Sequence, residues 1–156
     1  MLDYLQSLWC ALSASENNRG TIITFNKAIQ VEVPFASYGV TEWFAQVEIM
    51  RADPTICCSC CSPIAEAFNL ATSVLSSAPV LSGARSTVVV LISEGDPWQN
   101  VKKTDGTIWP YPTYTPADYR YVIVPNQAKA LKNINPSNIR IMFVGVPNAS
   151  GKPPAL

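Results

Sequence analysis

The chain has 156 residues, enough for one ordinary domain with a sizeable core, and its formal net charge is zero. Apolar residues make up 48% and charged residues only 14%, against roughly 25% charged in a typical soluble domain. This balance excludes a disordered chain and indicates that partners cover part of the surface. Because the sequence contains no histidine, the commonest general base and metal ligand, we expect a non-enzymatic protein.

The sequence gives no indication of export or of a membrane span. No apolar stretch approaches the about 20 residues that cross a bilayer. Residues 1–14 lack the positive start of a signal peptide. We therefore expect a reducing compartment, in which the five cysteines remain thiols.

The first segment is apolar at helical spacing and predicts a short amphipathic helix, ended by the polar residues 15–20. Such a helix is marginal alone and has to dock onto its own domain or onto a neighbouring subunit. We expect the second case, with the segment acting as an assembly arm. The residues of the arm are Leu2, Leu5, Leu8, Trp9 and Leu12.

Alternating apolar and polar residues follow the arm. Residues 21–33 predict two short strands joined at Asn26-Lys27, or one long strand with a bulge there. Residues 40–51 predict another strand, with Trp43 and Val47 on its inner face. Period two with one polar face is typical of an antiparallel sheet.

The second half of the chain predicts one helix and further strands. Ser62 as N-cap and Pro63 at the first helical position begin a helix that runs to residue 76. Residues 87–92 are apolar on both faces and predict a central strand. Strands are also predicted at 119–124 and 139–146, with one helical turn at 127–131.

Because strands and helices do not alternate in this pattern, we expect an all-β fold, an antiparallel β-sandwich or jelly roll. Its parts are an N-terminal arm at 1–20, a single β-sandwich domain at 21–146 and an extended C-terminal tail at 147–156.

A dense cysteine cluster precedes the helix. Its members are Cys57, Cys58, Cys60 and Cys61. Thiolates at this density can bind zinc or copper(I), and surface cysteines can be palmitoylated. Adjacent cysteines wrap one tetrahedral ion poorly, however, so the simpler interpretation is a set of small, reduced, mostly buried side chains.

Acidic residues flank a glycine where the central strand ends. Glu94 and Asp96 supply hard oxygen ligands that suit calcium, although acidic side chains in turns are commonly just solvated. We therefore expect no cofactor, with calcium at this turn as the alternative.

Aromatic and basic residues supply two candidate contact surfaces. The first is a proline-rich loop at 97–119 that could stack on a sugar, a base or a protein, or fold back over the domain; its aromatic residues are Trp98, Trp109, Tyr111, Tyr114 and Tyr119. The second is a set of separated basic residues that contact nucleic acid or form an ordinary solvated surface; these are Lys102, Lys103, Lys129, Lys132 and Arg140.

Taken together, the pattern resembles the single jelly-roll coat proteins of small icosahedral, satellite-like or other small RNA viruses. The similar features are the length, the arm before the first strand, the helix at 63–76, the proline-rich loops and the closing strand at 139–146 with its tail. Residues 1–18 contain no basic residue, so the resemblance does not extend to a basic genome-packaging arm.

The resemblance implies a non-enzymatic capsid or capsid-surface protein that assembles with itself into a shell, in the virion and in the host cytoplasm during assembly. Other capsid proteins and viral RNA are further candidate partners. The alternative function is a monomeric β-sandwich module that recognises glycan or protein through the 97–119 loop.

Overall fold

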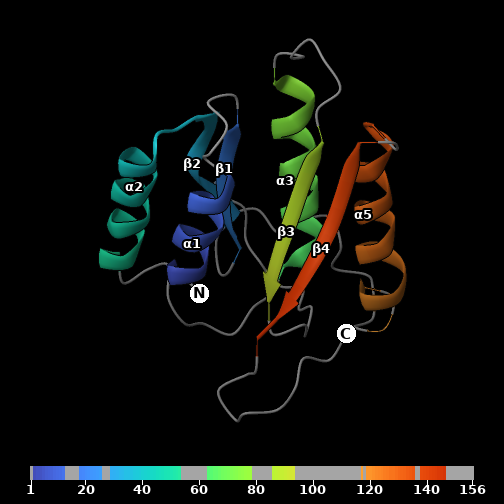
Figure 1. The fold of residues 1–156 in the computed structure, drawn as a ribbon. Helices are drawn as coiled ribbons and strands as arrows, with labels where there is room; N and C mark the ends of the chain where they lie inside the picture. The colour runs from blue at the N-terminus through green and yellow to red at the C-terminus, as the bar shows by residue number, and fades with distance from the viewer. Residues whose placement is uncertain are drawn as a thin grey trace. The chain divides into compact units, whose positions relative to one another are not determined.

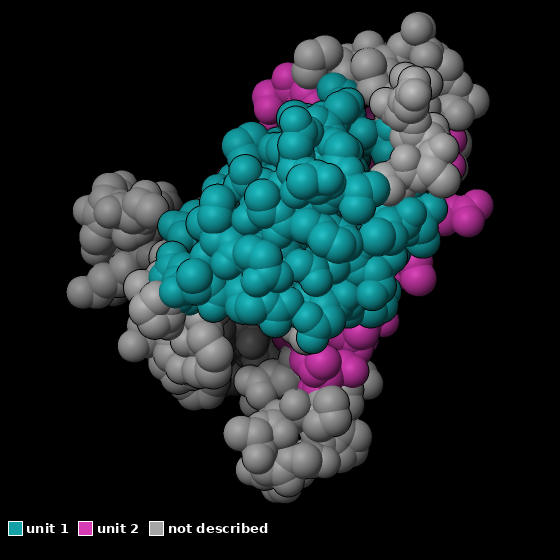
Figure 2. Space-filling model, turned by 60° about the vertical axis from the view of Figure 1, so that its left-hand side comes forward, with its two compact units in different colours: residues 1–24, 30–59 teal, residues 25–29, 60–156 magenta. Residues whose placement is uncertain are grey.

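The computed structural model of the protein describes residues 2–12, 18–25, 29–53, 63–78, 86–93, 117, 119–135 and 138–146 (Figure 1). Its fold is mixed α/β, with helices as well as strands in both halves of the chain, so the prediction of an all-β jelly roll is wrong. The chain divides into two compact units, coloured separately in Figure 2. Unit 1 is Met1–Thr24 with Gln30–Ser59, and unit 2 is Phe25–Ile29 with Cys60–Leu156.

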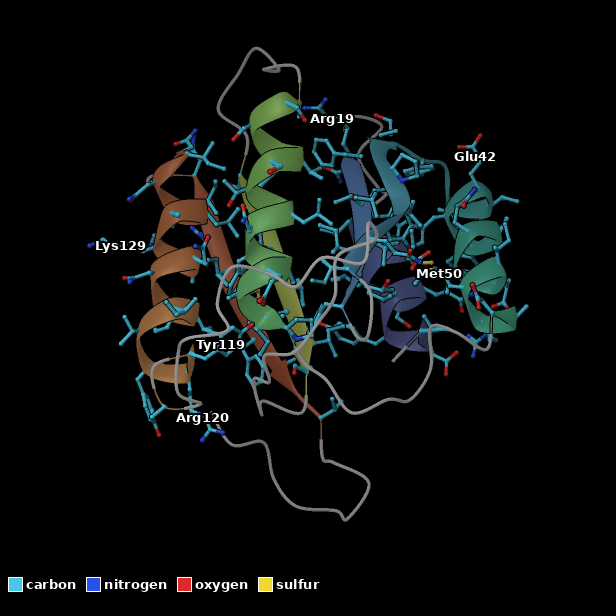
Figure 3. All side chains as sticks on the ribbon, turned by 180° about the vertical axis from the view of Figure 1, so that it is seen from behind. Arg19, Glu42, Met50, Tyr119, Arg120 and Lys129 are labelled. Carbon is cyan, nitrogen blue, oxygen red and sulfur yellow. The ribbon has the colours of Figure 1, made fainter. Side chains whose placement is uncertain are left out.

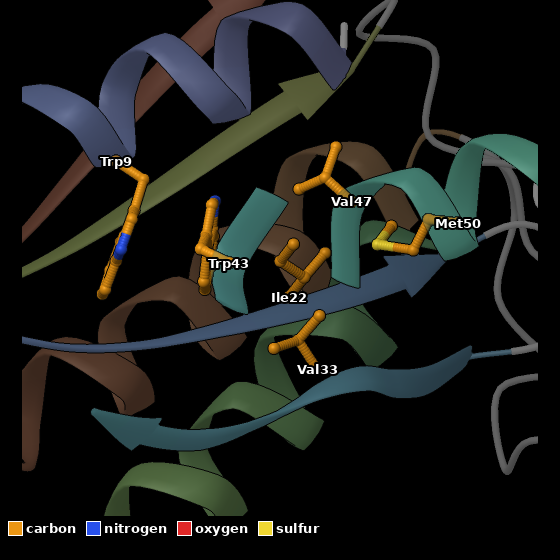
Figure 4. Packing of buried hydrophobic residues seen from close by; sticks show 6 residues of the cluster. All are labelled: Trp9, Ile22, Val33, Trp43, Val47 and Met50. Atoms are coloured by element: carbon orange, nitrogen blue, oxygen red, sulfur yellow. The ribbon is translucent and has the colours of Figure 1, made fainter. Parts of the chain in front are cut away.

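Unit 1 combines a β-hairpin with two helices. Its elements are α1 (Leu2–Leu12), β1 (Arg19–Phe25), β2 (Ile29–Ser37) and α2 (Val40–Ala52). The strands β1 and β2 are paired and run in opposite directions (Figure 4), as the short connection between them requires. This confirms the prediction of two strands in the first alternating segment.

The core of unit 1 contains side chains from all four elements (Figure 4). The Trp9 and Trp43 rings stack with centroids 4.2 Å apart, and the ring of Tyr38 meets both edge-on. The remaining buried members are Ile22, Val33, Val47 and Met50. At the surface, Arg51 of α2 pairs with Asp3 of α1 at 2.6 Å. The helix predicted at the N-terminus is therefore confirmed, and it packs within its own unit.

Residues 40–52 form a helix, so the prediction of a strand at 40–51 is wrong. The buried side chains are Trp43, Val47 and Met50, which share one helical face, whereas Ile49 is 64% exposed. The helix also has a start signal, because the Gly39 backbone N–H donates to Oε2 of Glu42 at 3.0 Å. Packing against Trp9 and the hairpin thus selects the helical period over the period of two.

Unit 2 is built around a parallel pair of strands. Its elements are α3 (Ile64–Ser77), β3 (Thr87–Ser93), the π-helix η1 (Tyr119–Ile123), α5 (Val124–Asn133) and β4 (Ile139–Gly145). The strands β3 and β4 are in parallel register from Thr87↔Ile139 to Ser93↔Gly145. Parallel neighbours need a crossover, and η1 with α5 lies on it. Helices and strands therefore alternate here, contrary to the argument that led to a sandwich.

The predicted helix at 63–76 and the predicted strands at 87–92 and 139–146 are confirmed by α3, β3 and β4. The N-cap of α3 is Pro63, and Ser62 lies outside the described residues. The prediction of a strand at 119–124 is wrong: Tyr119 and Ile123, four residues apart, are buried on one side of η1, and Tyr121 is 71% exposed. A strand would have placed Tyr119, Tyr121 and Ile123 on the same face.

Candidate interaction surface on the parallel sheet

The two faces of the β3–β4 sheet differ in what covers them. Side chains of paired residues in register lie on the same face, and successive residues alternate between faces. One face carries Val89 and Leu91 of β3 with Ile141 of β4, and these pack into one cluster with apolar residues of α3 and α5. The buried members contributed by the two helices are Ile64, Phe68 and Leu131.

The opposite face, here called the bare face, is apolar but is not covered by α3 or α5. It carries Val88, Val90 and Ile92 from β3, and Arg140, Met142 and Val144 from β4. The side chains of Val88 and Met142 are 48% and 53% exposed. Parallel sheets normally have both faces covered, and their strands are correspondingly apolar on both sides. The apolar composition of β3 therefore matches a strand buried on two faces, while the described residues of unit 2 bury only one.

A buried polar pair connects η1 to the first turn of α3. Tyr119 and Glu66 are 0% and 2% exposed, and the Tyr119 hydroxyl donates a hydrogen bond to Oε2 of Glu66. The Ala65 backbone N–H in the first turn of α3 donates to the Tyr119 oxygen at 3.2 Å. Burial raises the pKa of Glu66, while hydrogen bonds from Tyr119 and from its own backbone lower it, and burial is the larger effect. These bonds tie η1 to the start of α3.

We expect the substitution Glu66→Gln to remove a pH dependence of stability. The pKa of Glu66 is raised in the folded protein, so the unfolded chain loses this proton first as pH rises from about 4. The free energy of unfolding should therefore fall with rising pH until the folded carboxyl also ionises. Glutamine still accepts the Tyr119 hydrogen bond but does not ionise. Urea unfolding of both proteins between pH 4 and pH 8 measures this, and parallel profiles would contradict it.

The matched variant Tyr119→Phe separates the hydrogen bond from the charge. It removes the donor to Glu66 and the acceptor for the Ala65 N–H, and leaving a buried polar group unpaired costs about 1–3 kcal/mol. Loss of the hydroxyl also raises the pKa of Glu66 further, because the Tyr119 hydrogen bond lowers it. The decline in stability should then extend to higher pH than in the unchanged protein.

The predicted assembly arm is part of unit 1. Trp9 is buried in its core, Leu2 and Leu5 pack against that core, and Leu8 is half-buried. Only Leu12 among the five is exposed, at 44%. Packing inside unit 1 thus accounts for the apolar face of this helix without a neighbouring subunit.

Most of the other predicted sites lie outside the described residues. These are the cysteines Cys57, Cys58, Cys60 and Cys61, the acidic pair Glu94 and Asp96, the lysines Lys102 and Lys103, and the aromatic residues Trp98, Trp109, Tyr111 and Tyr114. Tyr119 of the predicted binding loop is described, and it is fully buried.

The described basic residues occupy two elements of unit 2. Lys129 and Lys132 are exposed on α5, and Figure 3 shows Lys129 directed away from β4. Arg140 is exposed on β4, among the apolar residues of the bare face. Sequence reasoning grouped Arg140 with the lysines by charge. Its place on the bare face could have been read from its position between Ile139 and Ile141, because successive residues of a strand point to opposite faces.

The described part of the chain contains neither a metal-binding cluster nor a membrane-spanning helix. Within the described ranges, no three cysteine, aspartate or glutamate side chains gather where they could hold a metal ion. No described helix is long and apolar enough to cross a membrane.

Comparison with known proteins shows the fold alone. No family model matches the chain, and no curated protein matches its sequence. The structure is similar to the crystal structure of the conserved hypothetical protein BatB from Bacteroides thetaiotaomicron, with a TM-score of 0.54 and 15% sequence identity. The match covers 97% of this chain and 63% of the BatB chain. It supports a mixed α/β fold, and the predicted resemblance to viral jelly-roll coat proteins is wrong.

Proposed function

We propose that this protein is a non-enzymatic binding module that associates with another protein through the bare face of the β3–β4 sheet. The observation that carries the proposal is the exposure of Val88 and Met142, at 48% and 53%, on the face of the sheet opposite the one where Val89, Leu91 and Ile141 pack against α3 and α5. The low charged fraction of the chain, 14%, agrees with a surface that is partly covered in use. Because the fold is mixed α/β and not a jelly roll, the architectural argument for a capsid shell no longer applies.

The chemistry of the bare face specifies the partner. Val88, Val90 and Met142 call for an apolar contact, and because they are already about half-buried, covering them contributes roughly half of the about 1.5–3 kcal/mol that complete burial supplies for each large side chain. Arg140 is the register partner of Val88 on the same face and carries the one charge there. A partner that covers this face has to satisfy the guanidinium group, so we propose an apolar protein surface that carries a carboxylate opposite Arg140.

The first test locates the contact. A photo-crosslinking amino acid is placed at Met142, and in a matched protein at Lys129, which is exposed on α5. A partner crosslinked from Met142 and not from Lys129 is identified by mass spectrometry and purified. Crosslinks that are equal from both positions would contradict the proposal.

The second test measures affinity with that purified partner. We expect Met142→Lys to weaken binding at least about tenfold, because a charge replaces an apolar contact, and Lys129→Glu to leave binding unchanged. Isothermal titration calorimetry measures both dissociation constants. An unchanged constant for Met142→Lys would overturn the assignment to this face. Light scattering of the purified protein tests self-association independently.

A further inference from the structure

The backbone of β3 has one edge without a neighbouring strand among the described residues, because β3 and β4 form a sheet of two strands. The Thr87 N–H donates to the Asn138 carbonyl at 2.8 Å, and the Val146 N–H donates to the Ser93 carbonyl at 3.0 Å. These bonds place the polar backbone groups of the odd-numbered residues of β3 toward β4. By alternation, the N–H and C=O groups of Val88, Val90 and Ile92 point to the opposite edge.

Nothing in the sequence of β3 protects this edge. Protected edges carry proline, lysine, an inward-pointing charge or a bulge, or they are very short. The segment Thr87–Ser93 reads TVVVLIS, with seven residues, no charge and no proline, and its register with β4 is continuous. Such a segment has the composition of a central strand, as its sequence alone predicts, yet it lies at the edge of a two-stranded sheet.

We infer that the open edge of β3 accepts an added strand from a partner polypeptide, which pairs with the backbone of Val88, Val90 and Ile92. This inference rests on the proposed binding function and adds to it the form of the partner. The added segment is extended and about as long as β3, so its backbone supplies a matching row of donors and acceptors.

The side chains flanking the edge define the composition of the added strand. On one side its residues lie next to Val89 and Leu91, which belong to the core with α3. On the other side they lie next to Val88 and Val90 on the bare face. Both environments are apolar, but only the side of Val89 and Leu91 is part of the core, so a charged residue there would be desolvated without a described partner. On the other side Val88 is 48% exposed, so a charged residue there would remain solvated. The partner segment is therefore extended, with uncharged apolar residues at least on the face that lies beside Val89 and Leu91.

The test uses a synthetic peptide with these properties, the sequence STVVVLIS of residues 86–93 flanked by lysines for solubility, added to the full chain. Hydrogen exchange is followed residue by residue. We expect saturating peptide to slow exchange of the Val88, Val90 and Ile92 amides by at least about tenfold. The Val89 and Leu91 amides, which face β4, should change little. A control peptide with the two central residues replaced by proline should give no protection, because proline has no N–H.

A pair of variants tests the edge itself. Val90→Pro removes an edge-facing N–H while leaving the bonds to β4, since proline is tolerated where the N–H of an edge strand faces outward. We expect it to weaken peptide binding at least about tenfold, whereas Val90→Thr, which keeps the N–H and the branched shape, should bind as the unchanged protein does. If Val90→Pro loses the protection of the Val89 amide, Ile92→Pro near the end of the strand carries the same test.

Three results would overturn the inference. The first is exchange at Val88, Val90 and Ile92 that the peptide does not slow. The second is protection of these amides in the free protein at every concentration, which would show that the chain itself covers the edge. The third is protection that rises with protein concentration without peptide, which would assign the edge to a second copy. Met142→Lys should leave the peptide result unchanged, so failure of the proposed contact at the bare face remains distinguishable.

Discussion

Replacing Trp9 by alanine is expected to lower the free energy of unfolding of unit 1 by about 3–5 kcal/mol. Trp9 is 4% exposed, stacks on Trp43 at 4.2 Å and meets Tyr38 edge-on at 6.5 Å. Alanine removes the apolar contact area and both ring contacts, and the rigid surroundings can fill only part of the resulting cavity. Urea unfolding followed by circular dichroism, together with hydrogen exchange of the β1 amides, measures the loss.

The matched control is Leu12→Ala on the same helix, where the side chain is 44% exposed. Both changes introduce alanine into α1, so both alter helix propensity slightly, but only Trp9→Ala opens the core. We expect the control to cost less than about 1 kcal/mol. Equal losses for the two variants would show that Trp9 does not contribute through packing.

Replacing Gly20 by valine is expected to destabilise unit 1 by about 3 kcal/mol, because the added side chain overfills the core instead of leaving a cavity. A Cβ atom at this position would lie 2.5 Å from Cζ3 of Trp9 and 2.9 Å from Cζ3 of Trp43. Both atoms belong to the stacked indole rings, which cannot move apart without losing their contact. Even Gly20→Ala should be measurably destabilising in urea unfolding.

Two further variants separate this clash from the general cost of replacing glycine. Gly39→Ala is the control, because a Cβ there would meet only Oε2 of Glu42 at 3.7 Å, an ordinary contact. In the double variant Trp9→Phe with Gly20→Ala, the smaller ring withdraws from the added methyl group. The cost of Gly20→Ala should then be smaller than in the unchanged protein. Additive costs would contradict the steric explanation.

The sequence predicts an element correctly where local pattern and tertiary packing agree. The helix α3 has apolar residues at helical spacing, and β3 and β4 are apolar runs too short for a buried helix. The prediction of a strand at 40–51 was wrong because Trp43 and Val47 fit both the strand period of two and the helical period of about 3.6. A period of two places Ala45 and Ile49 beside them, whereas the helix packs Phe44 and Met50, and contacts with α1 and the hairpin select the helical set. Residues 119–123 have high β-propensity but lie on the crossover between parallel strands.

The candidate surface follows only in part from the sequence. The apolar character of β3 on both faces, its lack of edge protection and the single charge in β4 are all readable from the residues. The sequence could not show that β4 is the neighbour of β3, or that α3 and α5 cover the face of Leu91 rather than that of Val90. The Glu66–Tyr119 pair was missed for the same reason, since its members lie 53 residues apart.

The sequence by itself determined where apolar side chains alternate or run together, and therefore which segments need a covering layer. Only the tertiary structure decided which segments supply that layer, whether the β3–β4 pair is parallel, and which side chains are left exposed. The physical reason is that periodicity is a local property of the chain, whereas burial depends on contacts between residues distant in sequence. Val88 and Leu91 are equally apolar in sequence, and the packing of α3 and α5 on one face alone makes one of them core and the other surface.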